Sequence, residues 1–335
     1  MAAEIILKLE NLRKTYQSRG GIFGQGKEVV ALDDISLEVH AGEVFGLVGE
    51  SGSGKTTCGR LVVGLEKPDS GGILLNGIQV TGLRGKALRR YRRLVQMVFQ
   101  DPYQSLNPQL SILDSVAEPL ITHRACPAGE REDRAAEALR MVGLSPAEQY
   151  LYRFPHQLSG GQRQRAAIAR AMILEPTCLV ADEPTSMLDA SYSAQIFQIL
   201  LEVRKRLGST IIFITHSLAA ARYLCDRLAV IYHGQLMELG PAREVIANPR
   251  HPYTQALMEA TPRFGRAART AENKAPLLEG RRTAAPGVGC AFFPRCARAD
   301  WAVCSRRASG WVEVGPDHMA ACHDLTCGRA AAGGV

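Results

Sequence analysis

The sequence has no uninterrupted apolar stretch of the ~18–20 residues that a membrane-spanning helix needs. Its opening residues also lack the pattern of a secretory signal, because Glu4 and Glu10 interrupt a short apolar run. These two absences predict a cytoplasmic protein. Any link to a membrane would then have to run through a partner protein.

Aromatic residues are few, at 6% of the chain, although 46% of the residues are hydrophobic and 22% are charged. A core built mainly from Ala, Val, Leu and Ile suits a parallel α/β sheet, whose strands are buried on both faces. The formal charge of +7 would fit an acidic partner, but solvated arginine-rich helices and an arginine-rich tail explain it slightly better. We therefore expect no nucleic-acid partner.

The hydrophobic pattern indicates an α/β core with an inserted and an appended segment. Short apolar runs predict a hairpin that turns at His233–Gly234 and strands at 5–9, 35–39, 44–48, 178–182 and 211–215. Loops rich in Pro and Asn, followed by a helical pattern over 131–142, indicate a mostly helical insertion over about 101–165. Residues 263–289, rich in Arg, Ala, Gly and Pro, are typical of a linker.

A phosphate-binding loop follows the strand predicted at 44–48. Residues 49–56 fit the pattern GxxxxGK[ST] at every position, and a helical pattern begins at Lys55. Glycines let successive backbone N–H groups surround phosphate oxygens, and the helix N-terminus adds positive potential. Lys55 supplies a charge to the β- and γ-phosphates, and the Thr56 hydroxyl can ligate Mg²⁺. The predicted MgATP loop comprises Gly49, Glu50, Ser51, Gly52, Ser53, Gly54, Lys55, Thr56 and Thr57.

An acidic pair ends the strand predicted at 178–182. Asp182 is suited to hold Mg²⁺ through its water shell, and Glu183 to orient or activate the attacking water. Taken alone, such a pair is typical of a solvated loop. It gains weight here because a phosphate-binding loop needs an acidic partner.

A third motif, Leu158-Ser159-Gly160-Gly161-Gln162, precedes a helical pattern over 163–174. Alone it would be explained as a helix N-cap. Together with the other two motifs, its order and spacing resemble the ABC ATPase family, over residues 1–262. The resemblance implies that Ser159, Gly160, Gly161 and Gln162 cover the γ-phosphate of ATP in a partner subunit. Two sites would then form when two subunits close head to tail.

The resemblance implies roles for two further loops. Gln100, after an apolar strand, resembles the Q-loop glutamine that touches Mg²⁺ and the membrane partner. Asp189 lies in a segment that resembles the D-loop, although Met187 stands where Ala is usual.

His216 resembles the switch histidine that senses the γ-phosphate, although Ser217 follows it where the family generally has Asp. With Lys55 and Glu183 it makes up the predicted catalytic set. Tyr16 resembles the aromatic residue that stacks on adenine.

Three segments, 99–108, 248–257 and 289–296, resemble the dipeptide and oligopeptide importers. The resemblance implies an importer ATPase at the cytoplasmic face of the inner membrane, paired with a sister ATPase or with itself. It also implies two transmembrane permease subunits and an extracytoplasmic solute-binding protein. The alternatives are a soluble ABC ATPase of translation or repair, an importer of a non-peptide solute such as nickel, and an ATPase accessory to a redox tail. A single signature motif and the short separation of Thr56 from Asp182 weigh against the soluble classes.

Five of the nine cysteines lie within 290–327. In a cytosolic chain such a cluster favours a metal site over disulfides, and the absence of any CxxC pair weakens the case for zinc. Ligation by Cys290, Cys296, Cys304 and Cys322 is compatible with a [4Fe–4S] cluster, which some importers that this tail resembles carry. A metal-free set of reduced thiols has equal weight. Cys327, His318 and His323 are alternative ligands.

These patterns predict an α/β P-loop NTPase core of the ABC type over 1–262, with an antiparallel β subdomain and the helical insertion. A small Cys-rich C-terminal extension over 263–335 would follow.

Overall fold

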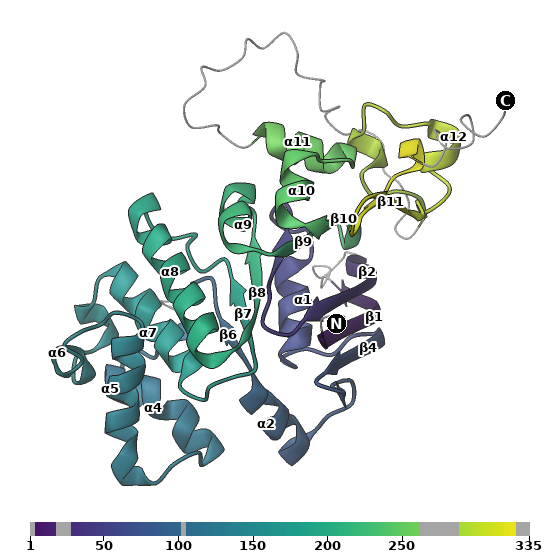
Figure 1. The fold of residues 1–335 in the computed structure, drawn as a ribbon. Coiled ribbons are helices and arrows are strands. Elements are labelled where there is room, and N and C mark those ends of the chain that lie inside the picture. Colours follow the sequence, from purple (N-terminus) through teal and green to yellow (C-terminus); the bar gives the residue numbers. More distant parts are fainter. Residues whose placement is uncertain (1–3, 18–27, 102–104, 261–287, 326–335) are drawn as a thin grey trace, which may run out of the picture.

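The computed structural model describes residues 4–17, 28–101, 105–260 and 288–325 (Figure 1). In these residues two sheets form. The larger sheet has the strand order β11 (Trp311–Gly315), β12 (His318–Ala321), β10 (Gln235–Pro241), β9 (Arg227–Tyr232), β3 (Val44–Val48), β8 (Thr210–Thr215), β7 (Cys178–Asp182) and β6 (Val95–Val98). The smaller, antiparallel sheet has the order β2 (Glu28–His40), β1 (Ile5–Gln17), β4 (Ser70–Leu75) and β5 (Ile78–Gln79).

Helices lie on both sides of the larger sheet, some packed on it and others beyond them (Figure 1). They are α1 (Lys55–Val62), α2 (Gly85–Leu94), α4 (Ile112–His123), α5 (Arg131–Met141), α6 (Glu148–Leu151), α7 (Gly160–Met172), α8 (Ala190–Leu207), α9 (Leu218–Leu224), α10 (Ala242–Ala247), α11 (Pro252–Ala260) and α12 (Trp301–Cys304). Short 3₁₀ turns lie at Ala128–Glu130, Pro155–Gln157 and Phe293–Arg295. Within the described ranges, no helix is both long and apolar enough to cross a membrane.

Alternation along the central strands assigns each side chain to one of two cores. In β3, Val44 and Val48 pack with the helical subdomain and α8, whereas Phe45 and Leu47 pack with α1 and the small sheet. Because both faces are covered, β3, β7 and β8 are buried throughout and read as unbroken apolar runs. Figure 1 shows the same division, with α4–α8 on one side of the sheet and α1 with β1, β2 and β4 on the other.

The predicted α/β core, antiparallel subdomain and helical insertion are confirmed, with two differences in extent. The strands predicted at 5–9 and 35–39 are parts of β1 and β2, which are 13 residues long. Register shifts in their pairing mark irregularities that curve the two strands, which obscures the period-two pattern in the sequence. The helix predicted at 163–174 begins earlier, at Gly160, because Ser159 caps it.

The described C-terminal residues, 288–325, extend the large sheet. Strand β12 pairs antiparallel with β10, where Glu238 faces Ala320 and Leu239 faces Met319. The carboxylate of Glu238 is fully buried and accepts the backbone N–H of Arg250 at 2.8 Å. The same carboxylate lies 2.7 Å from Nε2 of His318 on β12. Residues 263–287 of the predicted linker lie outside the described residues, and so does Cys327.

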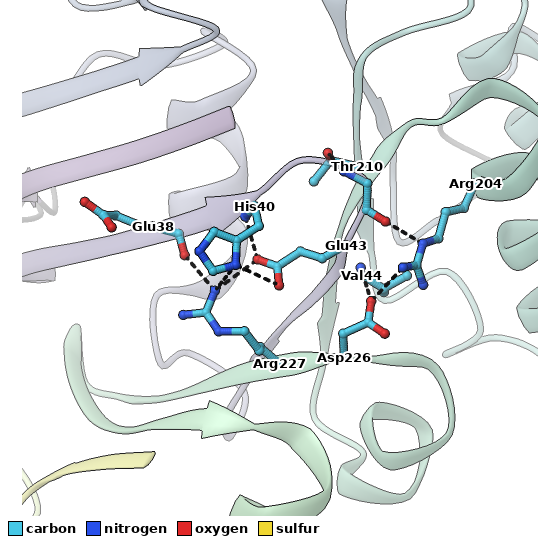
Figure 2. A network of polar contacts seen from close by, with 9 residues as sticks. Glu38, His40, Glu43, Val44, Arg204, Thr210, Asp226 and Arg227 are labelled. Atoms are coloured by element: carbon cyan, nitrogen blue, oxygen red, sulfur yellow. Dashed lines mark hydrogen bonds and ion pairs between the residues drawn. The ribbon is translucent and has the colours of Figure 1, made fainter. Parts of the chain in front are cut away.

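A polar network fixes the turn that feeds β3 (Figure 2). The buried Glu43 carboxylate accepts the backbone N–H of His40 at 2.7 Å and the Arg227 guanidinium at 3.1 Å. Nearby, Arg204 donates to the carbonyl of Gly42 at 2.6 Å and pairs with Asp226 at 3.0 Å. Asp226 in turn accepts the N–H of Val44 at 2.9 Å. These contacts tie the start of β3 to α8 and β9, so the strand that carries the phosphate-binding loop is anchored at its opposite end.

We predict that Glu43→Ala lowers the free energy of unfolding by about 2–3 kcal/mol, because it leaves Arg227 without its buried carboxylate partner. Chemical denaturation of the purified chain measures this change. Glu38→Ala is the matched control, since its half-exposed side chain pairs with Lys8 at the surface. The control should change stability by less than about 0.5 kcal/mol. Equal losses in the two variants would contradict the structural role of Glu43.

Candidate functional site

The loop after β3 follows a path that only glycine can take at two positions. A Cβ atom on Gly49 would lie 2.1 Å from the carbonyl oxygen of Ile231, at the end of β9. Gly54 has a φ of +104°, and a Cβ there would lie 2.3 Å from the carbonyl oxygen of Ala31 in β2. The loop is therefore wedged between β9 and β2, with its N–H groups and the start of α1 gathered at the sheet edge.

Lys55 lies beneath this loop. Its Nζ donates to the carbonyl oxygens of Gly49 at 2.8 Å and Glu50 at 2.7 Å, and to Oγ of Ser53 at 3.3 Å. Burial lowers the pKa of Lys55, while the carboxylates of Glu183, Asp182 and Glu50 act in the opposite direction. The side chain is thus a buried ammonium group held by the loop and facing the acidic residues.

The ends of β7 and α1 bring a hydroxyl and a carboxylate together. Oγ1 of Thr56 donates to Oδ1 of Asp182 at 3.1 Å. Asp182 is buried, and burial is the main reason why its pKa is raised. A carboxylate desolvated in this way gains from a neighbouring cation, and oxygen donors of these two kinds are the ligands that Mg²⁺ prefers. The pair therefore fits a magnesium site.

Glu183 lies between two further predicted residues. Its carboxylate accepts from Nε2 of Gln100 at 3.3 Å and lies 3.1 Å from Nδ1 of His216. The backbone at Glu183 has a φ of +42°, and its N–H donates to the carbonyl of Ile214 at 2.9 Å. The parallel strands β6, β7 and β8 end at the same edge of the sheet, which is how three residues distant in sequence meet.

The signature residues lie on the other side of the sheet. Helix α7 packs in the core cluster of the helical subdomain, whereas α1 packs in the opposite cluster with the small sheet. Ser159 Oγ accepts the N–H of Gln162 at 3.3 Å, and the Gln162 side chain accepts the N–H of Ser159 at 2.9 Å. This reciprocal cap leaves Ser159 exposed at the helix start. The structure therefore does not place the signature over the loop of its own chain.

Tyr16 and Asp189 lie at the margins of the site. The hydroxyl of Tyr16 donates to Glu66, and Nζ of Lys14 lies 5.5 Å from its ring centroid. The pKa of Tyr16 is raised mainly by burial, and Thr57 of α1 is among the groups that act to lower it, so the ring lies beside the loop helix. Asp189 stands at the N-cap position of α8, with an exposed side chain. Ser217, the departure noted after His216, caps α9 by accepting the N–H of Ala220 at 3.2 Å.

Two residues that contact the loop were not assigned roles from the sequence. The N–H of Glu50 donates to the hydroxyl of Tyr253 at 2.9 Å. The Glu50 carboxylate accepts from Arg295, with Nη1 to Oε2 at 2.9 Å and Nη2 to Oε1 at 3.3 Å. Both residues fall in segments that resemble the importers, but no pattern in one sequence connects them to residue 50.

Residues 32–186 match the sequence profile of the ABC transporter family, and residues 237–304 match that of the oligopeptide/dipeptide transporter C-terminal region. The chain is 40% identical to the oligopeptide transport ATP-binding protein AppF of Bacillus subtilis over 96% of this chain and 97% of AppF. The chain belongs to the oligopeptide/dipeptide ABC transporter ATPases. As a member, it binds and hydrolyses ATP.

Further similarities agree with this membership. The chain is 42% identical to the di/tripeptide transport ATP-binding protein DppF of Pseudomonas aeruginosa, over 88% of this chain and 91% of DppF. Among solved structures, the dimeric post-hydrolysis structure of the ATP-binding cassette MJ0796, bound to ADP and Pi, superposes with a TM-score of 0.63 at 34% identity. That similarity covers 71% of this chain and 99% of MJ0796.

The clustered cysteines of this ABC ATPase converge on one pocket. Its lining, called here the thiol pocket, includes Cys290, Cys296, Cys304 and Cys322, together with His251. The cavity volume is about 20 Å³. In the parts of the chain that the structure describes, no group of three or more His, Cys, Asp or Glu side chains is arranged to hold a metal ion. The predicted iron–sulfur site is thus not supported by side-chain spacing.

We predict that Gly49→Ala weakens MgATP binding roughly tenfold or more, because the new methyl group must displace the loop or the carbonyl of Ile231. Titration calorimetry on the purified chain measures the affinity. Gly42→Ala is the control, since it strains the backbone through a φ of +71° but its Cβ would meet no atom within 4 Å. The control should cost about 1 kcal/mol of stability and leave MgATP affinity unchanged. Normal affinity in Gly49→Ala would show that the loop is not tightly confined.

Proposed function

We propose that this chain drives peptide import, as the peripheral ATPase subunit of a bacterial importer at the cytoplasmic face of the inner membrane. The observation that carries the proposal is that the ATP site and the oligopeptide/dipeptide C-terminal region occur in one chain. Relatives named for oligopeptide and di/tripeptide transport are similar over nearly the whole chain. The complete importer would contain two transmembrane permeases and an extracytoplasmic solute-binding protein.

Within this proposal, Lys55 and the loop N–H groups hold the phosphates, and the Tyr16 ring stacks on adenine. Mg²⁺ would be held by Thr56 and Asp182, and Gln100 would also contact it. The ion would supply positive charge to the phosphates. The Thr56–Asp182 contact at 3.1 Å and the burial of Asp182 support this assignment.

Glu183 accepts the proton of the attacking water, and His216 contacts the γ-phosphate. The 3.1 Å approach of His216 to Glu183 supports these roles, since the imidazole orients the carboxylate that handles the water. Gln100 is also within reach of the same carboxylate, at 3.3 Å, so a change at the Q-loop can alter the water-handling group directly.

The importer as a whole is tested by purifying this chain with the proteins that accompany it in its own organism. We expect permease subunits to copurify, and peptides captured by the solute-binding protein to stimulate ATP hydrolysis in reconstituted vesicles. Stimulation by nickel but not by peptides would assign a non-peptide solute. Copurification with ribosomes or DNA-repair proteins, without permeases, would overturn the importer assignment.

We predict that Glu183→Gln preserves MgATP affinity and lowers the hydrolysis rate by about a hundredfold or more, because Gln retains the shape but cannot accept a proton. Steady-state hydrolysis by the assembled transporter and binding by the chain measure the two effects. Glu175→Gln, a change of the same kind at an exposed residue after α7, is the control and should hydrolyse ATP normally. Near-normal turnover in Glu183→Gln would refute the assigned role.

The signature residues require a second subunit. Helix α7 lies across the sheet from α1, so the signature is available to cover ATP in a partner subunit. The residues that would do so are Ser159, Gly160, Gly161 and Gln162, and Asp189 would lie near the contact between the two subunits. The partner would be a sister ATPase or a second copy of this chain. Each chain would then contribute Lys55 to one site and Ser159 to the other.

Ser159→Arg is expected to block ATP-dependent closure of the pair, since it places bulk and positive charge where the partner's nucleotide must fit. Light scattering of the chain mixed with its ATPase partner, with and without ATP, detects the closure. Thr81→Arg, at an exposed turn residue after β5 in the small sheet, adds the same charge away from the signature. Unchanged closure in Ser159→Arg would refute the head-to-tail geometry.

A second proposal concerns the thiol pocket: it holds a [4Fe–4S] cluster ligated by Cys290, Cys296, Cys304 and Cys322. Four thiol donors around one cavity suit such a group in kind and number, although the 20 Å³ between them is close to the space of one water, so the thiols would have to move apart. Burial raises the pKa of the Cys290 thiol to about 11, with Cys322 and Cys296 adding to the shift. Bound iron would oppose this shift by stabilising the thiolates.

His251, in the wall of the thiol pocket, supports the proposal. Its Nδ1 accepts the N–H of Tyr253 at 3.0 Å, and burial lowers its pKa to about 4, so the ring is neutral and carries its proton on Nε2. That Nε2 is buried and has no hydrogen-bond partner among the described residues. A sulfur-bearing group in the pocket would provide the missing acceptor.

We expect protein purified without oxygen to contain iron and acid-labile sulfide, and Cys296→Ser to lose both. Cys126→Ser, outside the thiol pocket, is the control and should retain the iron. Elemental analysis and visible absorption measure the content. Zinc without sulfide, or colourless protein with active ATPase and no metal, would overturn the cluster and leave the thiols as packing residues.

A further inference from the structure

The C-terminal segment touches the phosphate-binding loop through Arg295. This residue ends the 3₁₀ turn Phe293–Arg295, and its guanidinium makes the two contacts to the Glu50 carboxylate described above, at 2.9 and 3.3 Å. The same guanidinium donates to the hydroxyl of Tyr232 at 3.3 Å. A guanidinium that contacts one carboxylate through two nitrogens fixes the orientation of that carboxylate and also compensates its negative charge.

A second contact holds the same residue by its backbone. The N–H of Glu50 donates to the Tyr253 hydroxyl at 2.9 Å. The Tyr253 ring is fully buried, 4.5 Å from the centroid of Tyr232 and 5.3 Å from that of Phe292. Phe292 directly precedes the turn that carries Arg295, so one aromatic cluster positions both groups that hold Glu50.

Glu50 passes this constraint to the ATP site. Its carbonyl oxygen accepts from Nζ of Lys55 at 2.7 Å, and its carboxylate is one of three that act on the charge of Lys55. The N–H, the carbonyl and the side chain of Glu50 are therefore all engaged, two of them by α11 and the C-terminal segment. Without Arg295, an uncompensated negative charge would remain in the loop that must receive the ATP phosphates.

We propose that Arg295 is a positioning residue for ATP binding, which neutralises and orients Glu50 and thereby sets the loop that holds Lys55. The inference goes beyond the proposed transport function, since it depends on ATP binding alone and not on the identity of the solute. It gives the C-terminal segment a direct part in forming the nucleotide site.

The test compares MgATP affinity in variants of the full chain. Arg295→Gln should weaken binding about threefold to tenfold, within the range of a partly exposed ion pair, and Arg295→Lys should recover part of the loss. In the assembled transporter the KM for ATP should rise by a similar factor while kcat changes less than about twofold, because the pair acts equally before and during the reaction. Arg298→Gln is the matched control, since Arg298 contacts Gln255 and Asp324 and not the loop.

A double variant separates positioning from a general effect on folding. If Arg295 acts through Glu50, then Arg295→Gln should have no further effect on affinity in a Glu50→Gln background. Unchanged affinity in Arg295→Gln would overturn the proposal. It would equally be overturned if the losses of the two single variants added in full, or if Arg298→Gln weakened binding as much, because either result would mean that Arg295 only holds the C-terminal segment in place.

Discussion

The buried ammonium group of Lys55 is the constraint on which the site depends. A cation removed from water must be surrounded by acceptors, and here the carbonyls of Gly49 and Glu50 provide them at 2.8 and 2.7 Å. To present two successive carbonyls to one nitrogen, the loop must curl tightly, which is why Gly49 fits against Ile231 with no room for a side chain. The carboxylates of Asp182 and Glu183, at the C-terminal end of β7, then face an ammonium group whose position is already fixed.

The parts of the site that the sequence predicts are those whose chemistry is local. The strands predicted at 44–48 and 178–182 have those bounds in the structure, and the loop pattern of residues 49–56 and the acidic pair are recognisable because each is a set of adjacent side chains. The approach of Gln100 and His216 to Glu183 could be expected only through family resemblance, since it depends on parallel strands ending at a common edge. Their roles remain predictions.

What the sequence could not predict is pairing over long distances. The contact of Arg295 with Glu50 spans 245 positions, and no local periodicity records it. The composition of residues 263–289 predicts a linker, but it does not indicate that β12 pairs with β10 in the central sheet. The sequence also gives no sign that Glu238 and His318 form a buried pair, since each is a single polar residue in a run that otherwise favours a strand.

The pairing of β12 with β10 means that the chain has no natural point of division after α11. If the chain ended at Ala260, β10 would become the outermost strand of the sheet, with a row of backbone donors and acceptors open to pairing with another molecule. The buried carboxylate of Glu238 would also lose the imidazole that covers it. A chain shortened at this point would therefore be expected to associate through β10 even if its ATP site stayed intact.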